Sequence, residues 1–235
     1  MEQPNDLFCN DLPTVPKPEI GTVLVTGATG YIGGRLVPEL LARGYRVRVM
    51  VRMYSPEQQE RWPGAEIVVA DALNTRELKK ALDGVQVAYY LIHSMLLGKR
   101  EFEFADLQAV TNFRFIAEDK KLKRIIYLSG LGVDHPNLSN HLKSRFTVAE
   151  ILTRSTIPTT ILRAAIIIGS GSASYEIIEH IAKMIRDAGY QLIAEGIEDQ
   201  TTLELVIEMG ATHVQGFYFD KPVRLPHKLA HAGNQ

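Results

Sequence analysis

The sequence has little that would suggest a secreted or membrane protein. Its 235 residues contain one cysteine, Cys9, so neither an internal disulfide nor a pair of thiolates for a metal site can form. No apolar run approaches the ~18 residues that a membrane-spanning helix needs, and the first residues lack the basic and apolar regions of a signal peptide. We therefore expect a cytoplasmic protein with no metal site and no membrane partner.

An excess of charge is also missing. Lys and Arg together number 26 and Asp and Glu together number 27, which gives a formal net charge of −1. Nucleic-acid binding and binding to acidic membrane surfaces both rely on an excess of positive charge. The sequence therefore argues against a nucleic-acid partner, although a local anion site is compatible with it. Hydrophobic residues make up 46% of the chain, which is enough for the core of one large domain.

Apolar strands and amphipathic helices alternate along most of the chain. Short predicted strands in which most residues are apolar, such as 23–25, 46–51 and 124–128, are followed by stretches in which apolar residues have helical spacing. This alternation predicts a parallel sheet that helices cover on both faces, the three-layer α/β sandwich of Rossmann-like folds. We divide the chain into an irregular arm over 1–20, a dinucleotide-binding domain over 21–175, βα units over 176–225 that extend the same sheet, and a tail over 226–235.

A glycine-rich segment over 26–33 is the strongest functional signal. It follows a predicted strand and opens a predicted helix, the context in which such glycines bind a dinucleotide. The first glycine permits the tight turn, the second lets the backbone approach a pyrophosphate, and the third lets the helix pack close to the strand. The anion then lies on N–H groups at the helix N-terminus. The alternative is a structural turn that binds nothing. The expected cofactor contacts are Gly27, Thr29, Gly30, Tyr31, Ile32 and Gly33.

The end of the second strand distinguishes NADP from NAD. An Asp or Glu there binds the ribose 2′-hydroxyl, whereas a 2′-phosphate needs a cation. The strand 46–51 is followed by Arg52 and by no acid, and an arginine can bind a phosphate through two N–H groups. Arg48 on the same strand is a second, less well placed candidate. We therefore expect NADP, with NAD as the alternative cofactor, unless Arg52 is only a solvated surface residue.

Asp71 ends the third predicted strand. A carboxylate at this place can accept a hydrogen bond from the adenine amino group; the alternative is a residue that only begins the next helix.

Residues 22–172 resemble the atypical short-chain dehydrogenases/reductases, in particular their NmrA-like and epimerase-like branch. The spacing of Gly27, Gly30 and Gly33 is that of this family. Four further segments lie where the family contacts its cofactor: 71–72, 89–94, 127–130 and 162–164. The resemblance implies a Rossmann-like fold and additional cofactor contacts from Ala72, Leu91, His93 and Arg163.

The catalytic pattern of that family is incomplete in this sequence. Active members pair a serine after the fifth strand with a Tyr-x-x-x-Lys motif on the next helix. Ser129 fits the serine, but His141 and Arg145 stand where the tyrosine and the lysine are expected. His141 could transfer a proton, because its natural pKa is near neutrality, and Arg145 could hold ribose hydroxyls. A solvated helix face is the alternative for both.

The last quarter of the chain resembles a different family. Residues 181–224 are similar to the C-terminal quarter of EAL-type cyclic-di-GMP phosphodiesterases, which are (β/α)₈ barrels, and the blocks 194–198 and 214–219 carry the resemblance. It implies that Glu195 and Gln215 occupy active-site positions at the ends of two strands. Since the metal-binding carboxylates of that barrel are absent from the sequence, we do not expect a two-metal phosphodiesterase. Two families in one chain indicate an engineered or recombined chimera.

These patterns allow functions of different classes. The first is a module that binds NADP(H) with little or no turnover, because the sequence carries a clear pyrophosphate-binding motif but lacks the Tyr-x-x-x-Lys motif. The second is an active NADP-dependent reductase or epimerase that uses Ser129 and His141. The third is a designed fold without physiological activity.

Overall fold

The computed structural model describes residues 14–92, 99–131, 140–164, 167, 173–195, 197, 200–216 and 218–219; for 99–103, 140–141 and 173–178 it describes the backbone alone. Within these residues the chain divides after residue 166 into two units. Each unit has a sheet of its own.

Six parallel strands in the order β3-β2-β1-β4-β5-β6 form the sheet of the first unit. The strands are β1 (Thr22–Thr26), β2 (Arg46–Val51), β3 (Glu66–Val69), β4 (Val85–Tyr90), β5 (Arg124–Gly130) and β6 (Thr159–Ala164). The strand order reverses between β1 and β4, the place at which open α/β sheets bind ligands outside the carboxyl ends of their strands. The predicted Rossmann-like fold is therefore confirmed.

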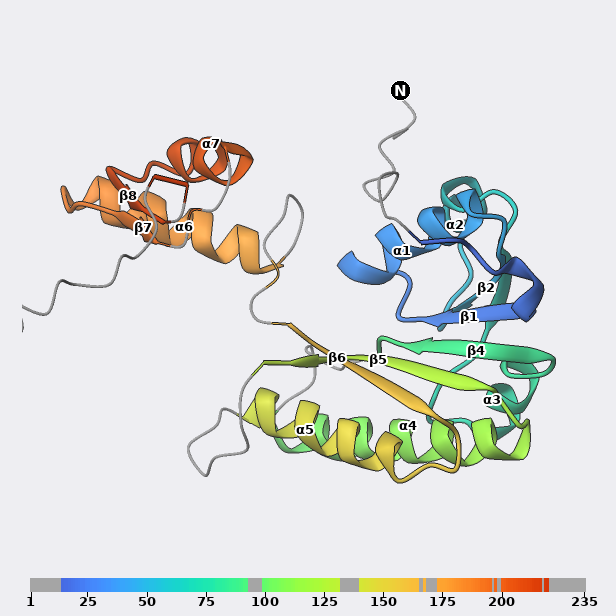
Figure 1. Ribbon diagram of the computed structural model, residues 1–235. Coiled ribbons are helices and arrows are strands. Elements are labelled where there is room, and N and C mark those ends of the chain that lie inside the picture. Colours follow the sequence, from blue (N-terminus) through green and yellow to red (C-terminus); the bar gives the residue numbers. More distant parts are fainter. Residues whose placement is uncertain are drawn as a thin grey trace, which may run out of the picture. The chain divides into compact units, whose positions relative to one another are not determined.

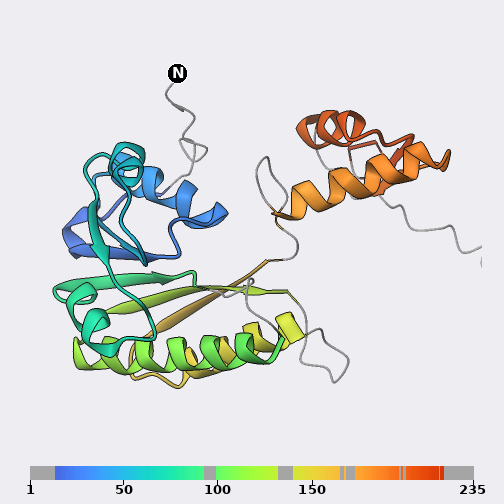
Figure 2. The same ribbon diagram turned by 180° about the vertical axis from the view of Figure 1, so that it is seen from behind.

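Helices cover both faces of this sheet (Figure 1), so the predicted three-layer arrangement is confirmed as well. A short 3₁₀ helix, η1 (Pro18–Ile20), precedes β1 within the predicted arm. α1 (Tyr31–Ala42) and α2 (Pro56–Arg61) lie over one face, and α3 (Thr75–Ala81), α4 (Lys99–Asp119) and α5 (Asn140–Thr153) lie over the other. Figure 2 shows α4 and α5 side by side along the sheet.

Each layer has its own buried cluster. Val37 of α1 and Trp62 after α2 pack against Val49 on the first face. Leu78 of α3 and Phe113 of α4 belong to the cluster on the second face. β1 and β4 at the centre of the sheet are buried along most of their length, which is why their sequences are mostly apolar. The outer strands β3 and β6 contain no buried residue.

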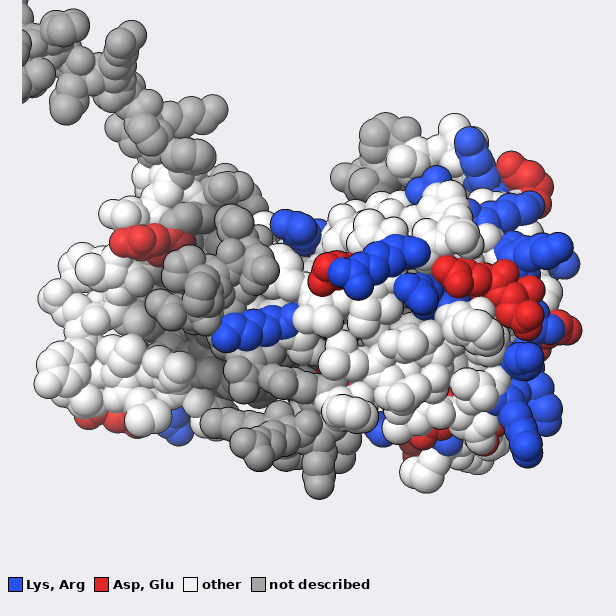
Figure 3. All heavy atoms as spheres, turned by 90° about the horizontal axis from the view of Figure 1, so that it is seen from below, with Lys and Arg blue, Asp and Glu red and all other residues white. Residues whose placement is uncertain are grey.

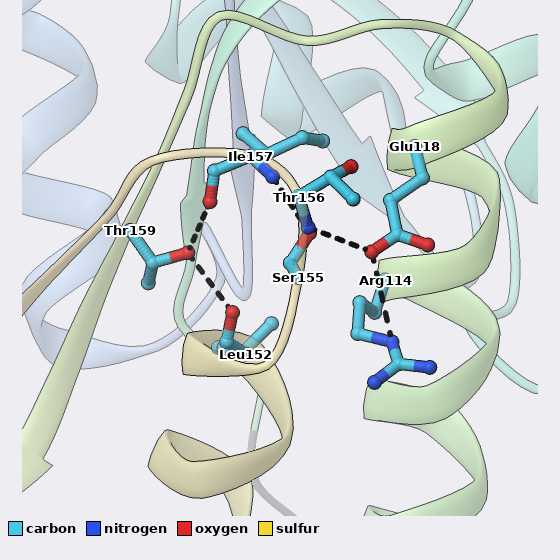
Figure 4. A network of polar contacts seen from close by, with 7 residues as sticks. All are labelled: Arg114, Glu118, Leu152, Ser155, Thr156, Ile157 and Thr159. Carbon is cyan, nitrogen blue, oxygen red and sulfur yellow. Dashed lines mark hydrogen bonds and ion pairs between the residues drawn. The ribbon is translucent and has the colours of Figure 1, made fainter.

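Polar contacts join the connection between α5 and β6 to α4 (Figure 4). Glu118 Oε1 on α4 accepts a hydrogen bond from the Thr156 N–H at 3.1 Å and lies 4.0 Å from Arg114 Nε. Thr159 Oγ1 lies 3.1 Å from the Leu152 carbonyl oxygen and so links the end of α5 to the start of β6. These contacts satisfy backbone groups in a tight connection.

The second unit contains α6 (Ala173–Asp187), β7 (Ile193–Glu195), α7 (Gln200–Glu208) and β8 (His213–Gln215). β7 and β8 pair with each other in parallel and form a two-stranded sheet. The prediction that the C-terminal strands extend the six-stranded sheet is therefore wrong for the residues that the structure describes. The physical reason is that α7 is a crossover between adjacent parallel strands, so that each strand finds its hydrogen-bonding partner within the same βαβ unit.

Basic and acidic side chains are interspersed on the face shown in Figure 3. This distribution agrees with the formal net charge of −1. Within the described ranges, no helix combines the length and the apolar character required to cross a bilayer.

Candidate dinucleotide site

The turn from β1 to α1 brings backbone N–H groups to the carboxyl end of the sheet. The Gly30 N–H donates to the Gly27 carbonyl at 3.0 Å, and the Gly34 N–H donates to the Gly30 carbonyl at 2.9 Å. Gly30 is the N-cap residue of α1 and has no side chain with which to cap the helix. The N–H groups of the first helical turn therefore have no acceptor within the helix and can bind an anion.

Close contacts explain two of the three predicted glycines. Gly27 has φ +63°, in the left-handed region, and a Cβ there would lie 2.5 Å from the Leu91 carbonyl oxygen. A Cβ on Gly33 would lie 2.5 Å from the Gly27 carbonyl oxygen and 2.6 Å from Ala28 Cα. All of these are backbone atoms, which cannot move aside without a change in the fold.

Gly30 is open on the side where a Cβ would project. A Cβ on Gly30 would lie 3.3 Å from the Gly27 carbonyl oxygen, with no other described atom within 4 Å. Thr29 beside it is exposed, and Tyr31 and Ile32 in the first turn of α1 are half-buried. The turn thus offers a ligand an open strip of backbone, and its geometry fits a pyrophosphate.

Thr26, which the sequence interpretation did not single out, fixes this turn against β4. Its buried hydroxyl donates to the Tyr89 carbonyl at 3.1 Å and accepts a hydrogen bond from the Leu91 N–H at 3.0 Å. Leu91, a predicted cofactor contact, is half-buried beside the turn. The hydroxyl therefore joins the two strands at which the strand order reverses. In the sequence, the only indication of this role is that Thr26 is the first residue of the glycine-rich segment.

Arg52 and Asp71 follow β2 and β3 at the same edge of the sheet, as predicted. Arg52 is exposed and has neither a hydrogen bond nor an ion pair among the described residues. Asp71 is half-buried; its Oδ1 accepts from the Leu73 N–H at 2.8 Å, and its own N–H donates to Glu77 Oε2 at 2.8 Å. Ala72 is buried. A surface depression of about 570 Å³ lies here, and the residues that line it are Asp71, Leu73, Asn74, Thr75, Arg76 and Glu77.

Arg48 is engaged away from this edge. Its Nη1 donates to the carbonyl oxygens of Ala81 at 2.9 Å and of Asp83 at 2.6 Å, and its Nε lies 2.8 Å from Glu66 Oε2. A cation is favourable at this place, because the C-terminal end of α3 carries partial negative charge. The secondary prediction of Arg48 as a phosphate ligand is therefore wrong: its guanidinium holds β2 against α3.

Two of the predicted catalytic residues, Ser129 and Arg145, meet where β5 contacts α5. Ser129 is 3% exposed, and its Oγ lies 3.5 Å from the Arg145 carbonyl oxygen. The Tyr127 hydroxyl donates to the same oxygen at 3.3 Å, and Arg145 Nη1 donates to the Leu128 carbonyl at 2.9 Å. Burial raises the pKa of Tyr127, and the Arg145 guanidinium opposes this shift. These side chains bind backbone groups and so hold α5 to β5.

The other predicted residues are placed as follows. Arg163 lies near the carboxyl end of β6, opposite Ser129 in the ladder, and is exposed with its guanidinium 5.5 Å from the centre of the Phe146 ring. His141 lies in the first turn of α5, and its side chain is outside the described residues, as is the whole of His93.

In the second unit, Glu195 and Gln215 lie opposite each other in the β7–β8 ladder. Glu195 is the last residue of β7, and Gln215 is the last residue of β8. Within the described residues there is no group of three or more His, Cys, Asp or Glu side chains that could hold a metal ion.

Comparisons with known proteins bear on the first unit and on the beginning of the second. The sequence model of the NAD(P)H-binding family matches residues 27–188. The chain is 30% identical over 132 residues to the sterol demethylase protein B of Methylococcus capsulatus and 29% identical over 153 residues to the ceramide reductase of Caulobacter vibrioides. These matches cover 54% and 64% of this chain, but only 40% and 48% of the two relatives. The chain therefore spans less than half the length of either relative.

Solved structures share the fold. A putative NAD-dependent epimerase/dehydratase from Bacillus halodurans is 26% identical, with a TM-score of 0.57 over 65% of this chain and 74% of that chain. The Bordetella bronchiseptica enzyme WbmH in complex with NAD⁺ is 15% identical, with a TM-score of 0.59 over 83% of this chain and 74% of that chain, a likeness of fold alone. With the six-stranded sheet, the open glycine turn and the family match all in agreement, the chain belongs to the NAD(P)H-binding family.

Proposed function

We propose that this protein binds NADP(H) at the β1–α1 turn and prefers it to NAD(H) because of Arg52. The observation that carries the proposal is the exposed guanidinium of Arg52, which has no partner among the described residues at the edge where β2 ends. No acid follows β2 to bind a ribose 2′-hydroxyl. A cation without an acid at this position favours a 2′-phosphate.

The remaining predicted residues have distinct roles in this proposal. The glycine turn holds the pyrophosphate on the N–H groups of α1, and Asp71 and Ala72 contact the adenine. Leu91 and His93 after β4 and Arg163 on β6 contact the nicotinamide half. When bound, the cofactor would supply hydride-transfer chemistry. The turn contacts are Gly27, Thr29, Gly30, Tyr31, Ile32 and Gly33.

We propose further that the chain by itself has little or no catalytic turnover. The Oγ of Ser129 is directed to a backbone carbonyl of α5, and Arg145 donates to a backbone carbonyl of β5. Both groups therefore stabilise the packing of α5 on β5 and are not free to contact a substrate. The sequence also has His141 in place of the tyrosine that active short-chain dehydrogenases use as their acid and base.

Calorimetric titration with NADPH, NADP⁺, NADH and NAD⁺ tests the cofactor assignment. We expect binding of both NADP forms and an at least tenfold weaker binding of both NAD forms. Equal affinities would contradict the role of Arg52. Absorbance at 340 nm with NADPH and a panel of carbonyl compounds tests turnover. A substrate-dependent loss of NADPH that requires Ser129 would show an active reductase instead.

We also propose that the chain joins two families near residues 176–182, as an engineered or recombined chimera. The parallel pairing of β7 and β8 across a single helix is the local arrangement of a (β/α)₈ barrel, and it sets Glu195 beside Gln215. We expect these two residues to be inactive relics. Hydrolysis of cyclic-di-GMP by the protein that disappears in Glu195→Ala would contradict this interpretation.

A further inference from the structure

Arg61 at the end of α2 reaches the first turn of α1. A Cβ added to Gly34 would overlap Arg61 Nη2 and would lie 3.1 Å from its Cζ. The same Cβ would lie 3.4 Å from the Ala28 carbonyl oxygen, which belongs to the glycine turn. The guanidinium therefore occupies the space that a side chain at position 34 would fill, and this space adjoins the turn.

The charge of Arg61 is not neutralised by the described part of the chain. Its Cζ lies 5.1 Å from the centre of the Trp62 ring, and the structure gives it no hydrogen bond or ion pair with a described residue. Trp62 is 1% exposed and packs in the cluster that contains Val37 and Leu40 of α1. Arg61 is thus an exposed cation on a rigid aromatic base, with its five N–H donors available to an acceptor.

Arg52 and Arg61 come from the same short segment after β2. Arg52 directly follows the strand, and Arg61 ends the helix that Ser55 begins through a capping box with Gln58. Both side chains are exposed, and neither has an acidic partner among the described residues. An adenosine ribose at the end of β2 would therefore have one cation at the strand end and a second cation beside the first turn of α1.

We propose that Arg61 is a specificity-determining residue that binds the 2′-phosphate of NADP(H) together with Arg52, and that the absence of a side chain on Gly34 makes room for it. This inference rests on the proposed NADP(H) site. Two guanidinium groups on one phosphate bind the dianion more tightly than one, because each forms charge-assisted hydrogen bonds. The competing explanation is that the aliphatic stem of Arg61 only covers Trp62.

The test uses two fragments that differ by the phosphate alone, 2′,5′-ADP and 5′-AMP, titrated into the full chain. Arg61→Met keeps a straight apolar stem over Trp62 and removes the charge. We expect it to weaken 2′,5′-ADP binding about 10- to 150-fold, the range for a lost charge-assisted hydrogen bond, and to leave 5′-AMP binding within twofold. The dependence of log K on log salt concentration should also become shallower for 2′,5′-ADP alone.

Two further variants separate charge from packing. Gly34→Ala displaces the Arg61 guanidinium but suits a helix, so it should weaken 2′,5′-ADP without lowering the melting temperature. Arg124→Met is the matched control, because Arg124 begins β5 at the amino end of the sheet, where its Nη1 donates to Thr160 Oγ1 at 2.8 Å. It should leave both affinities unchanged.

The outcomes distinguish this inference from the proposed function. If the wild type prefers 2′,5′-ADP and Arg52→Ala abolishes the preference while Arg61→Met does not, the inference is wrong and the proposed function stands. If the wild type binds both fragments equally, the proposed NADP preference itself is wrong. A parallel loss of both fragments in Arg61→Met, with a lower melting temperature, would assign Arg61 a packing role and overturn the inference.

Discussion

Substitution of valine for Gly30 or for Gly33 should affect different properties of the protein, dinucleotide binding in the first case and stability in the second. At Gly30 the added Cβ would meet one described atom, the Gly27 carbonyl oxygen, at 3.3 Å. At Gly33 it would meet two backbone atoms of the turn at 2.5 and 2.6 Å. We therefore expect Gly30→Val to abolish dinucleotide binding in a folded protein, and Gly33→Val to destabilise the fold itself.

The magnitudes follow from the kind of contact that each change affects. Valine at the N-cap is unfavourable, so Gly30→Val should lower the free energy of unfolding by about 1 kcal/mol, or roughly 2–4 °C in melting temperature for a domain of this size. In Gly33→Val the added side chain would overpack against backbone atoms of the turn, which should lower the free energy of unfolding by ~1–3 kcal/mol or more. If valine at position 30 blocks two charge-assisted hydrogen bonds of about 1.5–3 kcal/mol each, dinucleotide affinity falls at least ~100-fold.

Urea denaturation gives the unfolding free energies, and calorimetric titration with NADPH gives the affinities. Gly30→Ala is the graded control, with a smaller side chain at the same place and an intermediate loss of affinity. NADPH binding by Gly30→Val within threefold of the wild type would refute the assignment of this turn as the pyrophosphate site. Equal destabilisation by the valines at positions 30 and 33 would refute the distinction drawn from the contact distances.

Three further predictions concern specificity, stability and pH. Arg52→Ala should weaken NADP⁺ binding by about 1.5–3 kcal/mol and barely affect NAD⁺; equal losses in calorimetry would show that Arg52 does not contact the 2′-phosphate. Thr26→Val removes the hydroxyl between Tyr89 and Leu91 and should lower the free energy of unfolding in urea by about 1–3 kcal/mol, because the partly buried Leu91 N–H loses its acceptor, whereas Thr26→Ser should retain most of the stability. Burial, with a contribution from Asp106, raises the pKa of Tyr90 well above its usual value of 10.0. The unfolded chain therefore loses this proton first as the pH rises above about 10, so the free energy of unfolding falls there, and Tyr90→Phe should make that fall shallower; an unchanged slope would contradict the role of Tyr90.

Several features of this protein are determined by short stretches of sequence. The apolar runs and the helical spacing between them predicted the strands and helices of the first unit, because a strand buried on both faces needs a continuous apolar segment. The glycine turn was also predictable, because its glycines lie in one short segment between a strand and a helix, and a Cβ on Gly33 would meet Gly27 and Ala28 of that same segment. The positions of Arg52 and Asp71 at one edge of the sheet were predictable because parallel strands all end at the same edge.

Other features depend on which segments meet in space. Periodicity along the chain identifies β7 and β8 as strands, but it does not specify whether they pair with β6 or with each other. Ser129 and Arg145 looked like free catalytic groups in the sequence, and only the packing of α5 on β5 directs both to backbone carbonyls.

The difference between Arg48 and Arg52 has the same origin. Both belong to the segment around β2, yet the end of α3 and Glu66 surround Arg48, whereas Arg52 has no such neighbours among the described residues. The relation between Gly34 and Arg61 likewise exists only after α2 has folded back beside α1. Local sequence determined where the backbone turns and which residues are buried. Which hydrogen bonds and ion pairs a polar side chain forms depended on partners distant along the chain, because these contacts form over a few ångströms in space.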